Sequence, residues 1–239
     1  MEIVKDSMLI GYVTGNSIDR KFMQSVFNYM NYDAQNRRCV LGLFNKEGFF
    51  VDDNRNSLVR QFLKTPAEWL LSLDTDISFD APAPYALFDS AKKNGAMIMA
   101  GIYFGFVADG AVRPTWWVEG DEATGKIKTI PAIKFGEVYQ LAACGMGFTL
   151  IHRSVFETFL LTPWADSVWT WFGRDLALIG DQPAPTGEDV TFCLRAKTLG
   201  FSTFGHAGVE AKHAKRIELG WKEFAIFYQA NYKGVRGDA

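Results

Sequence analysis

The sequence is poor in cysteine and has no long uninterrupted apolar run. Its three cysteines, Cys39, Cys144 and Cys193, are too few for a disulfide framework and lack the CxxC spacing of a zinc site. We therefore expect reduced thiols. No apolar segment reaches the roughly 18 residues that a membrane helix needs, and the start MEIVKDSMLIGYV does not resemble a signal peptide. These features predict a cytoplasmic protein without a membrane span.

Basic charge is also not in excess. The chain carries 25 Lys and Arg against 27 Asp and Glu, a formal net charge of -2. A field that attracts nucleic acid over the whole surface is therefore excluded, although a local basic strip from Lys212 to Lys233 would suffice for duplex contact. Internal repeats, low-complexity segments and a convincing linker are lacking as well. With 239 residues, 48% of them hydrophobic, the sequence predicts one globular domain.

Apolar runs and helical patterns alternate along the first half of the chain. Strand patterns occupy Met8–Gly15, Cys39–Phe44 and Glu68–Leu73, and another follows in Ala96–Phe104. Helical spacing separates them, with Asp19 as the expected N-cap of the first helix. This alternation predicts an α/β fold: a mainly parallel, Rossmann-like central sheet with helices on both faces.

The stretch WLLSLDTDISFDAP places two carboxylates, Asp74 and Asp76, at the end of an apolar strand. Ligands of such sheets bind beyond the carboxyl ends of the strands, and a buried carboxylate needs a partner. An Asp-x-Asp triplet can hold a divalent cation through oxygen ligands, but it also occurs in ordinary turns. On the triplet alone, both interpretations stay open.

Further chemistry-bearing residues lie in the second half of the chain. Glu188 and Asp189 open a helical pattern, where acids either complement the helix dipole or act as a base at the rim of a cleft. His213 is followed by cations in VEAKHAKR, an arrangement that suits a metal ligand beside a phosphate site. Trp116 and Trp117 stand in a polar segment, which favours stacking on a sugar or a base over burial.

Four segments in this order resemble the GT-A glycosyltransferases of the family-two type. RNSLVRQFL is similar to the family's helix against the nucleotide sugar, and WLLSLDTDISFDAP to its Asp-x-Asp strand. GMGFTLIHRSVFE resembles the Gly-rich acceptor segment, and GEDVTFCLRAKTLGF the helix of the catalytic acid pair. The resemblance covers most of Met8–His213 but not the middle loop or the final helix. We predict one domain over 1–239, with a nucleotide-sugar half (1–104), an acceptor and catalytic half (105–217), and a C-terminal helix and tail (218–239).

The resemblance also implies residue roles. Asp76 and His213 would bind Mn²⁺ or Mg²⁺, with His206 as the competing ligand. Asp189 would be the catalytic base, with Glu188 as runner-up. The donor, a nucleoside-diphosphate sugar and usually a uridine one, would be bound by a set drawn from both halves of the chain: Thr14, Arg55, Asn56, Asp74, Lys212 and Lys215. Direct displacement would invert the anomeric carbon, although the sequence leaves a retaining mechanism open.

The implied activity is therefore a metal-dependent transfer of a hexosyl-type sugar to a hydroxyl acceptor. The acceptor is a protein, a glycan or a modified DNA base, and the acidic pI of 6.0 favours protein or glycan. A bacterial enzyme, or one of a phage in its host's cytosol, fits this short chain. Two rivals stay open: a non-catalytic module of the same fold that binds a nucleotide sugar or carbohydrate, and a nucleotidyltransferase, which GYVTGNSIDRK matches poorly.

Overall fold

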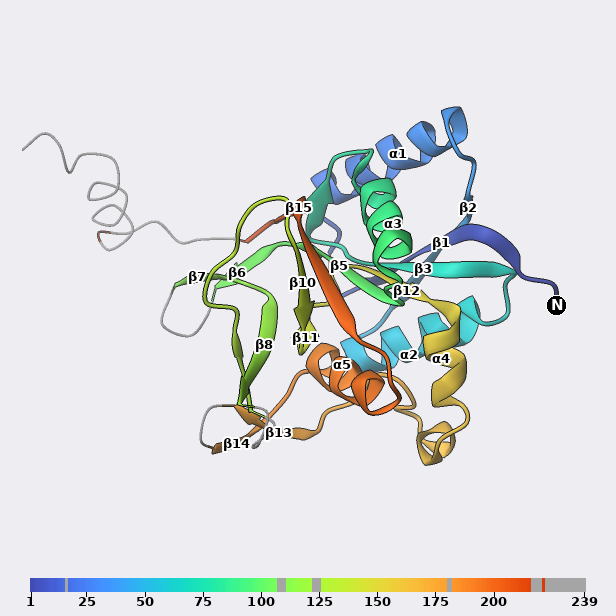
Figure 1. Cartoon of the computed structure of the whole chain (residues 1–239). Coiled ribbons are helices and arrows are strands. Elements are labelled where there is room, and N and C mark those ends of the chain that lie inside the picture. The colour runs from blue at the N-terminus through green and yellow to red at the C-terminus, as the bar shows by residue number, and fades with distance from the viewer. Residues whose placement is uncertain (16, 107–110, 122–125, 180–181, 216–220, 222–239) are drawn as a thin grey trace, which may run out of the picture.

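The chain forms a single α/β domain around a mixed, mainly parallel sheet (Figure 1). The computed structural model describes residues 1–239 except 16, 107–110, 122–125, 180–181, 216–220 and 222–239. The predicted terminal helix and tail (218–239) thus lie outside the described residues, apart from Trp221. Within the described part, no helix is long and apolar enough to cross a membrane.

The central sheet contains five strands that run in one direction. Its order is β10 (Val138–Leu141), β15 (Thr203–His213), β5 (Ile98–Ile102), β12 (Phe148–His152), β3 (Ala67–Asp74), β1 (Val4–Thr14) and β2 (Val40–Glu47), and the short β4 (Ile77–Phe79) pairs with the end of β15. Strands β1, β2, β3, β5 and β15 are aligned, whereas β12 and β10 are antiparallel to their neighbours. The carboxyl ends of β1 and β3 consequently lie side by side, with Val13 opposite Asp74.

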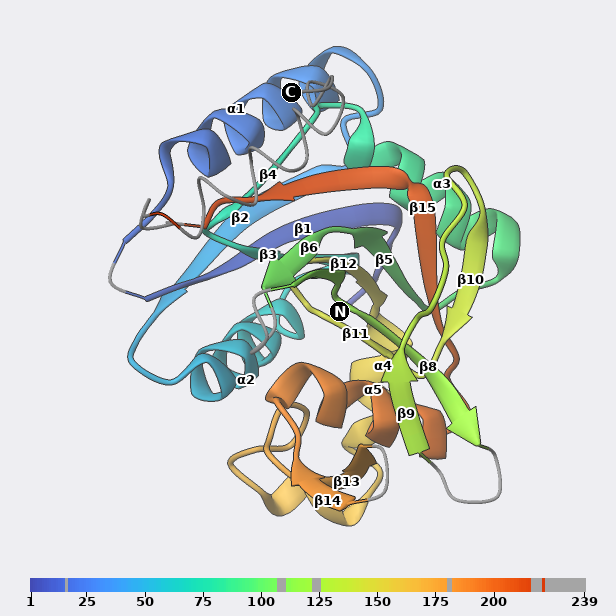
Figure 2. The ribbon, with the colours of Figure 1, turned by 90° about the vertical axis from the view of Figure 1, so that its left-hand side faces the viewer.

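Helices cover both faces of this sheet, as Figures 1 and 2 show. One face carries α1 (Arg20–Gln35) and α3 (Ala83–Asn94); the other carries α2 (Val51–Phe62), α4 (Arg153–Phe159) and α5 (Glu188–Thr198). Each face has its own buried apolar cluster. The side chain of Asp19 caps α1 by accepting a hydrogen bond from the backbone N–H of Lys21 at 2.7 Å, as the sequence predicts.

A smaller sheet lies beside α5. Its order is β11 (Ala143–Cys144), β8 (Trp116–Asp121), β9 (Lys126–Thr129), β13 (Leu176–Ile179) and β14 (Gln182–Pro185). A hairpin of β6 (Phe104–Phe106) and β7 (Val112–Pro114) follows directly after β5, and a short 3₁₀ helix spans Pro163–Asp166.

The described fold confirms the α/β architecture and corrects several local expectations. Trp116 is fully buried rather than presented to a ligand, because β11 and β8 pair over it and its ring packs into the core. The apolar run expected as one strand over Ala96–Phe104 is divided at Tyr103 into β5 and β6. Cys144 and Cys193 are buried free thiols, as predicted.

Candidate functional site

A cavity of about 460 Å³ opens at the carboxyl ends of β1 and β3. It brings together side chains that lie far apart in the sequence. Most of the residues predicted for the site line it: Thr14, Arg55, Asp74, Asp76, Glu188, Asp189, His213 and Lys215. The sheet order explains the convergence, since β1, β3 and the start of α5 all meet at this edge.

The turn after β3 separates the two aspartates. Asp74 is the last residue of the strand, and Asp76 lies in the tight turn that leads into β4. The backbone carbonyl of Asp76 accepts a hydrogen bond from the N–H of Ala214 at 2.8 Å, which ties this turn to the end of β15. The two carboxylates therefore contact different elements: Asp74 faces α2, and Asp76 faces β15 and the residues after it.

Arg55 of α2 connects the Asp-x-Asp turn to the start of α5. Its guanidinium, only 4% exposed, donates to Oδ1 of Asp74 at 2.8 Å and to Oε1 of Glu188 at 3.1 Å. A buried guanidinium costs free energy unless its donors find acceptors, and the two carboxylates, with Oγ of Ser72 at 3.4 Å, give each of its three nitrogens a partner. Glu188 is thus held as an ion-pair partner of Arg55.

Asp76, His213 and Lys215 form a second charged group at the cavity mouth. Oδ2 of Asp76 lies 3.0 Å from Nε2 of His213 and 2.8 Å from Nζ of Lys215. Burial by itself would raise the pKa of Asp76, but the hydrogen bonds from His213 and Lys215 outweigh it and lower the pKa to about 2. Asp76 is therefore ionised at any physiological pH.

The ring of His213 is oriented by the backbone of the hairpin. Nδ1 lies 2.9 Å from the carbonyl oxygen of Phe104, which can only accept, so Nδ1 carries a proton. The edge of Tyr103 also packs against this ring, with centroids 5.4 Å apart. Nε2 faces Oδ2 of Asp76, to which it can donate a hydrogen bond. A cation between the two residues would replace that proton and would be bound by the lone pair of Nε2 and the carboxylate together.

Asp189 lies in the same cavity, at the start of α5. Burial, followed by the charge of Glu188, raises the pKa of Asp189 to about 6, against the lowering effects of Arg55 and the N–H of Val190. A carboxyl group with this pKa is mostly ionised at pH 7 yet takes up a proton more readily than an ordinary aspartate. A pKa near 6 would suit a general base.

Tyr103 is a site residue that the sequence did not indicate. It lines the cavity, is 4% exposed, and its hydroxyl accepts a hydrogen bond from the N–H of Gly147 at 3.1 Å. A Cβ on Gly145 would lie 2.1 Å from that hydroxyl, and one on Gly147 would lie 2.9 Å from Oδ2 of Asp74. Both glycines of GMGF therefore make room for Tyr103 and Asp74. The sequence shows the two glycines but not which side chains lie against them.

Three of the predicted residues, and the competing histidine, lie elsewhere or play another part. Asn56 is fully buried away from the cavity, where Oδ1 accepts from the N–H groups of Trp171 and Phe172 at 3.0 and 3.1 Å. Lys212 does not line this cavity but lines two others. Thr14 lines the cavity wall, but its hydroxyl donates to Oδ1 of Asn45 at 2.7 Å. His206 does not line the cavity and pairs with Val138 near the start of β15.

The protein groups available to a metal are few. No group of three or more His, Cys, Asp or Glu side chains capable of holding a metal ion occurs among the described residues. The candidate ligands are the pair Asp76 and His213. Magnesium-type sites commonly use one or two protein ligands and complete the shell with substrate phosphates and water, so this pair fits a cation that arrives with a phosphorylated ligand.

No protein-family model matches the chain, and no curated protein is similar to it in sequence. Solved structures of similar fold include the following two. GalNAc-T7 with UDP, GalNAc and Mn²⁺ aligns at TM-score 0.57 and 13% identity, over 89% of this chain and 44% of that one. The viral protein A197 from STIV aligns at TM-score 0.51 and 16% identity, over 88% and 86%. The chain thus spans less than half of the GalNAc-T7 chain.

At these identities the similarity concerns the fold alone. The chain has a single α/β domain with the Rossmann-like architecture of the GT-A glycosyltransferases. The assignment to the family-two type rests on the four sequence segments and is not supported by a family match.

Proposed function

We propose that the protein is a metal-dependent glycosyltransferase that moves a sugar from a nucleoside-diphosphate sugar, preferably a uridine one, to a hydroxyl group. The observation that carries the proposal is the placement of Asp76 and His213 at the mouth of a cavity that also contains Asp189. A cation-binding pair and a carboxylate of raised pKa then face the same space. Direct displacement needs both functions, one for the leaving group and one for the incoming hydroxyl.

Asp76 and His213 would hold Mn²⁺ or Mg²⁺ together with oxygens of the diphosphate. Such a cation, when bound, neutralises negative charge on the leaving diphosphate. Lys215 lies on Oδ2 of Asp76 at 2.8 Å and is exposed enough to turn toward a phosphate oxygen. Its ammonium group would then add a second positive charge beside the leaving group.

Asp189 would accept the proton of the acceptor hydroxyl as the oxygen bonds to the anomeric carbon. The bond between that carbon and the diphosphate oxygen breaks in the same step, and the nucleoside diphosphate leaves with the electron pair. We assign inversion to this direct displacement. Glu188 would not compete for the proton, since Arg55 occupies it.

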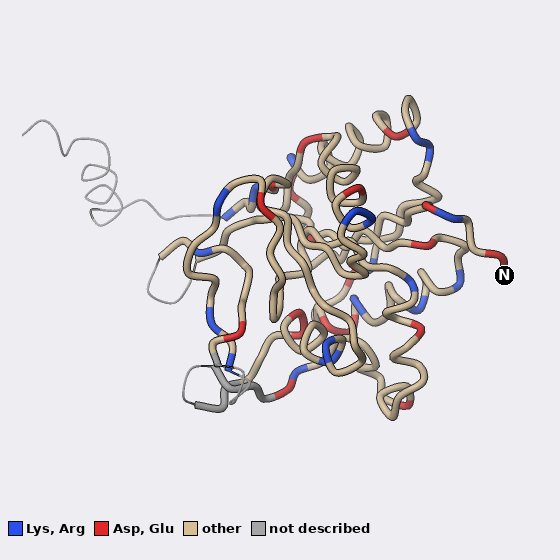
Figure 3. Tube along the Cα trace, in the orientation of Figure 1, with Lys and Arg blue, Asp and Glu red and all other residues tan. Residues whose placement is uncertain are grey.

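The donor would bind to the half formed by 1–104, where Thr14 and Asp74 line the wall of the cavity. Arg55 would act as a positioning residue by fixing the carboxylate of Asp74 against the ribose or the sugar. The segment 105–217 supplies Asp189 and His213 and would receive the acceptor. We favour a protein or glycan acceptor over a modified DNA base, because basic and acidic residues are interspersed along the described chain (Figure 3).

A binding titration tests this proposal. Isothermal titration of the protein with UDP in the presence of Mn²⁺ should give measurable affinity, which EDTA abolishes. Asp76→Ala should lose the metal-dependent part. Asp166→Ala, which changes an exposed aspartate of the 3₁₀ helix away from the cavity, is the matched control and should bind as the unchanged protein does. Equal affinity of Asp76→Ala and the control would remove Asp76 as a ligand.

A further inference from the structure

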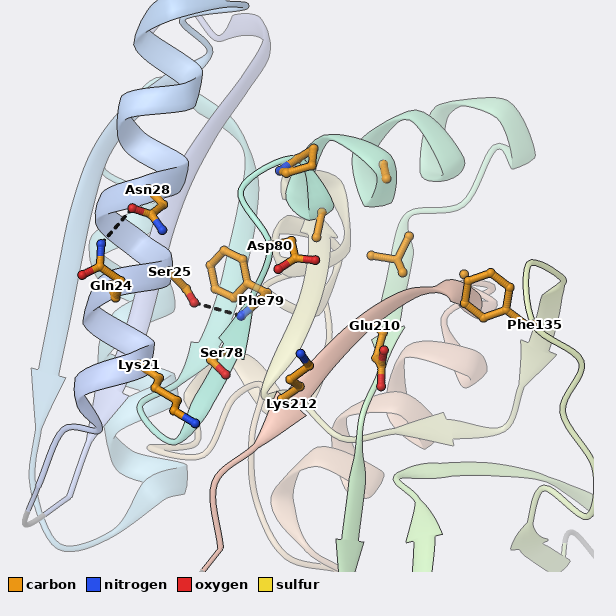
Figure 4. Close-up of a pocket in the computed structure, with 15 residues that line it drawn as sticks. Lys21, Gln24, Ser25, Asn28, Ser78, Phe79, Asp80, Phe135, Glu210 and Lys212 are labelled. Carbon is orange, nitrogen blue, oxygen red and sulfur yellow. Dashed lines mark hydrogen bonds between the residues drawn. The ribbon is translucent and has the colours of Figure 1, made fainter.

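A second cavity, of about 580 Å³, is separate from the candidate active site; Figure 4 shows the side chains that line it. Its walls are α1, the connection from β4 to α3, and the middle of β15. It shares no lining residue with the cavity of Asp76 and Asp189. Successive strand residues point to opposite sides, which is why Lys212 reaches this cavity and His213 reaches the other one.

Four charged side chains from separate segments line this cavity without neutralising one another. Lys21 and Lys212 are the cations, and Asp80 and Glu210 the acids. All four are exposed, and none forms an ion pair with any residue that the structure describes. These groups are therefore available to a ligand.

The cations lie toward one end of the cavity, on either side of Ser78 (Figure 4). Two ammonium groups and a hydroxyl that can donate are the groups that hold a carboxylate or another anionic substituent. Farther along β15, the carboxylate of Glu210 follows, and Asp80 lies above Lys212. Carboxylates accept hydrogen bonds from hydroxyl groups. The lining therefore combines an anion site with acceptors for a hydroxyl-rich ligand.

The polar wall on α1 adds both a donor and an acceptor. Nε2 of Gln24 donates to Oδ1 of Asn28 at 2.8 Å. The oxygen of Gln24, an acceptor, and the amide nitrogen of Asn28, a donor, are not used in this bond and can bond to other groups. The floor is apolar and fixed, because the ring of Phe79 stacks on Phe148 and its N–H donates to Oγ of Ser25 at 3.0 Å.

An exposed aromatic ring closes the far end. Phe135 is 80% exposed and lines the cavity, and the backbone directly after it is tied to β15. Gly136 has φ +85°, a conformation that favours glycine, and the carbonyl of Glu137 accepts from the N–H of Ala207 on β15 at 2.8 Å. The exposed ring offers a flat apolar surface to a ligand.

We propose that this second cavity binds an oligosaccharide that carries a carboxylate group. The carboxylate lies between Lys21 and Lys212, and a sugar ring lies against Phe135. The hydroxyl groups in between bond to Asp80, Glu210 and the amides of α1. The binding itself does not depend on the proposed transfer reaction, but a role as the site for an acceptor chain rests on it.

Other ligand classes fit the lining less well. A nucleic acid would bring its phosphates toward Asp80 and Glu210, which repel them. A neutral oligosaccharide would leave two ammonium groups without a partner. The combination of both charge signs, two amides and one exposed ring is therefore best matched by an acidic glycan.

Calorimetric titration of the full chain, without nucleotide or metal, tests the proposal. The probes are an oligomer of hexuronic acid and a neutral hexose oligomer of the same length. We expect the acidic oligomer to bind at least tenfold more tightly. Equal affinities, or no heat from either probe at millimolar concentration, would overturn the proposal.

Matched variants locate the binding. Phe135→Ala should weaken binding of the acidic oligomer at least tenfold. The control is Phe27→Ala, which removes an exposed ring outside the cavity and should leave binding unchanged. Lys212→Met should remove the preference for the acidic oligomer, and Lys64→Met is its control. Duplex DNA is a further probe. If DNA binds, and binding is lost in Lys212→Met but kept in Phe135→Ala, the cavity is a general polyanion surface and the assignment to an acidic glycan is wrong.

A last variant separates this site from the proposed active site. Asp76→Ala should still bind the acidic oligomer with unchanged affinity, because the two cavities share no residue. If the unchanged protein binds the oligomer but no nucleotide-sugar donor, only the proposed transferase function is overturned. Normal donor binding with no oligomer binding would overturn only this inference.

Discussion

Nε2 of His213 lies 3.0 Å from Oδ2 of Asp76, although 137 positions separate the two residues in the sequence. The contact arises because β4 pairs with the end of β15, which places the turn after β3 next to His213. Nδ1 of His213 is engaged by the carbonyl of Phe104, so Nε2 is the nitrogen left for a ligand. This geometry distinguishes His213 from His206 as the candidate metal ligand.

His213→Ala should weaken Mn²⁺ binding in the presence of UDP, whereas His206→Ala should not. Changes to residues that only support a metal ligand cost roughly tenfold or more in affinity, and loss of a direct ligand should cost at least as much. Mn²⁺ titration followed by electron paramagnetic resonance measures the free metal. The reverse order of the two variants would reassign the ligand to His206.

Activity should depend on the ionisation of Asp189. The pKa of Asp189 is about 6, and a protonated carboxyl cannot accept the hydroxyl proton. We expect kcat/KM to rise with pH and to level off above about pH 6. Asp189→Asn should keep donor binding and lose about 10²- to 10⁴-fold in rate. Full activity in this variant would place the base elsewhere.

The same carboxyl should lower the stability of the folded protein at neutral pH. Its pKa is raised from 3.8 to about 6 on folding, so the folded state holds the proton more tightly and loses stability as pH rises between these values. Asp189→Asn removes this effect. Its melting temperature should equal that of the unchanged protein near pH 4 and exceed it at pH 8. The corresponding gain in the free energy of unfolding at pH 8 should be on the order of 1–3 kcal/mol. Equal melting at both pH values would argue against a raised pKa.

Arg55→Met should affect both stability and the pH profile. It leaves Asp74 and Glu188 without their buried partner, which costs about 3 kcal/mol or more in such pairs. It also removes a charge that lowers the pKa of Asp189, so the midpoint of the pH–rate profile should move above 6. Arg55→Lys keeps the charge and should move the midpoint less. A midpoint unchanged in Arg55→Met would separate Arg55 from the base.

The elements with clear periodicity could be predicted from the sequence. The buried runs of β1 and β3 and the capped helix α1 follow from local patterns, and these elements carry Asp74 and Asp76 to the sheet edge. The antiparallel direction of β12 could not be predicted, because strand direction depends on neighbours that are distant in the chain. The polar neighbours of Trp116 likewise suggested exposure, whereas pairing with β11 buries it.

The candidate site was predictable at the level of residue types, and less so for individual partners. Arg55 and Asn56 are adjacent in the sequence, yet the helix turns one toward Asp74 and the other toward the backbone of Trp171 and Phe172. The alternation along β15 similarly separates Lys212 from His213. Tyr103 was missed because its role depends on the glycines that pack around it.

Thermal melting against a panel of nucleotides and nucleotide sugars, with Mn²⁺ and with EDTA, tests the central claim most directly. Ligands that bind only the folded state raise the melting temperature by mass action. The account predicts a rise with one diphosphate sugar that is present with Mn²⁺ and absent with EDTA, and that sugar would identify the donor. No shift with any nucleotide would contradict the transferase assignment and leave Asp74 and Asp76 as an ordinary capped turn.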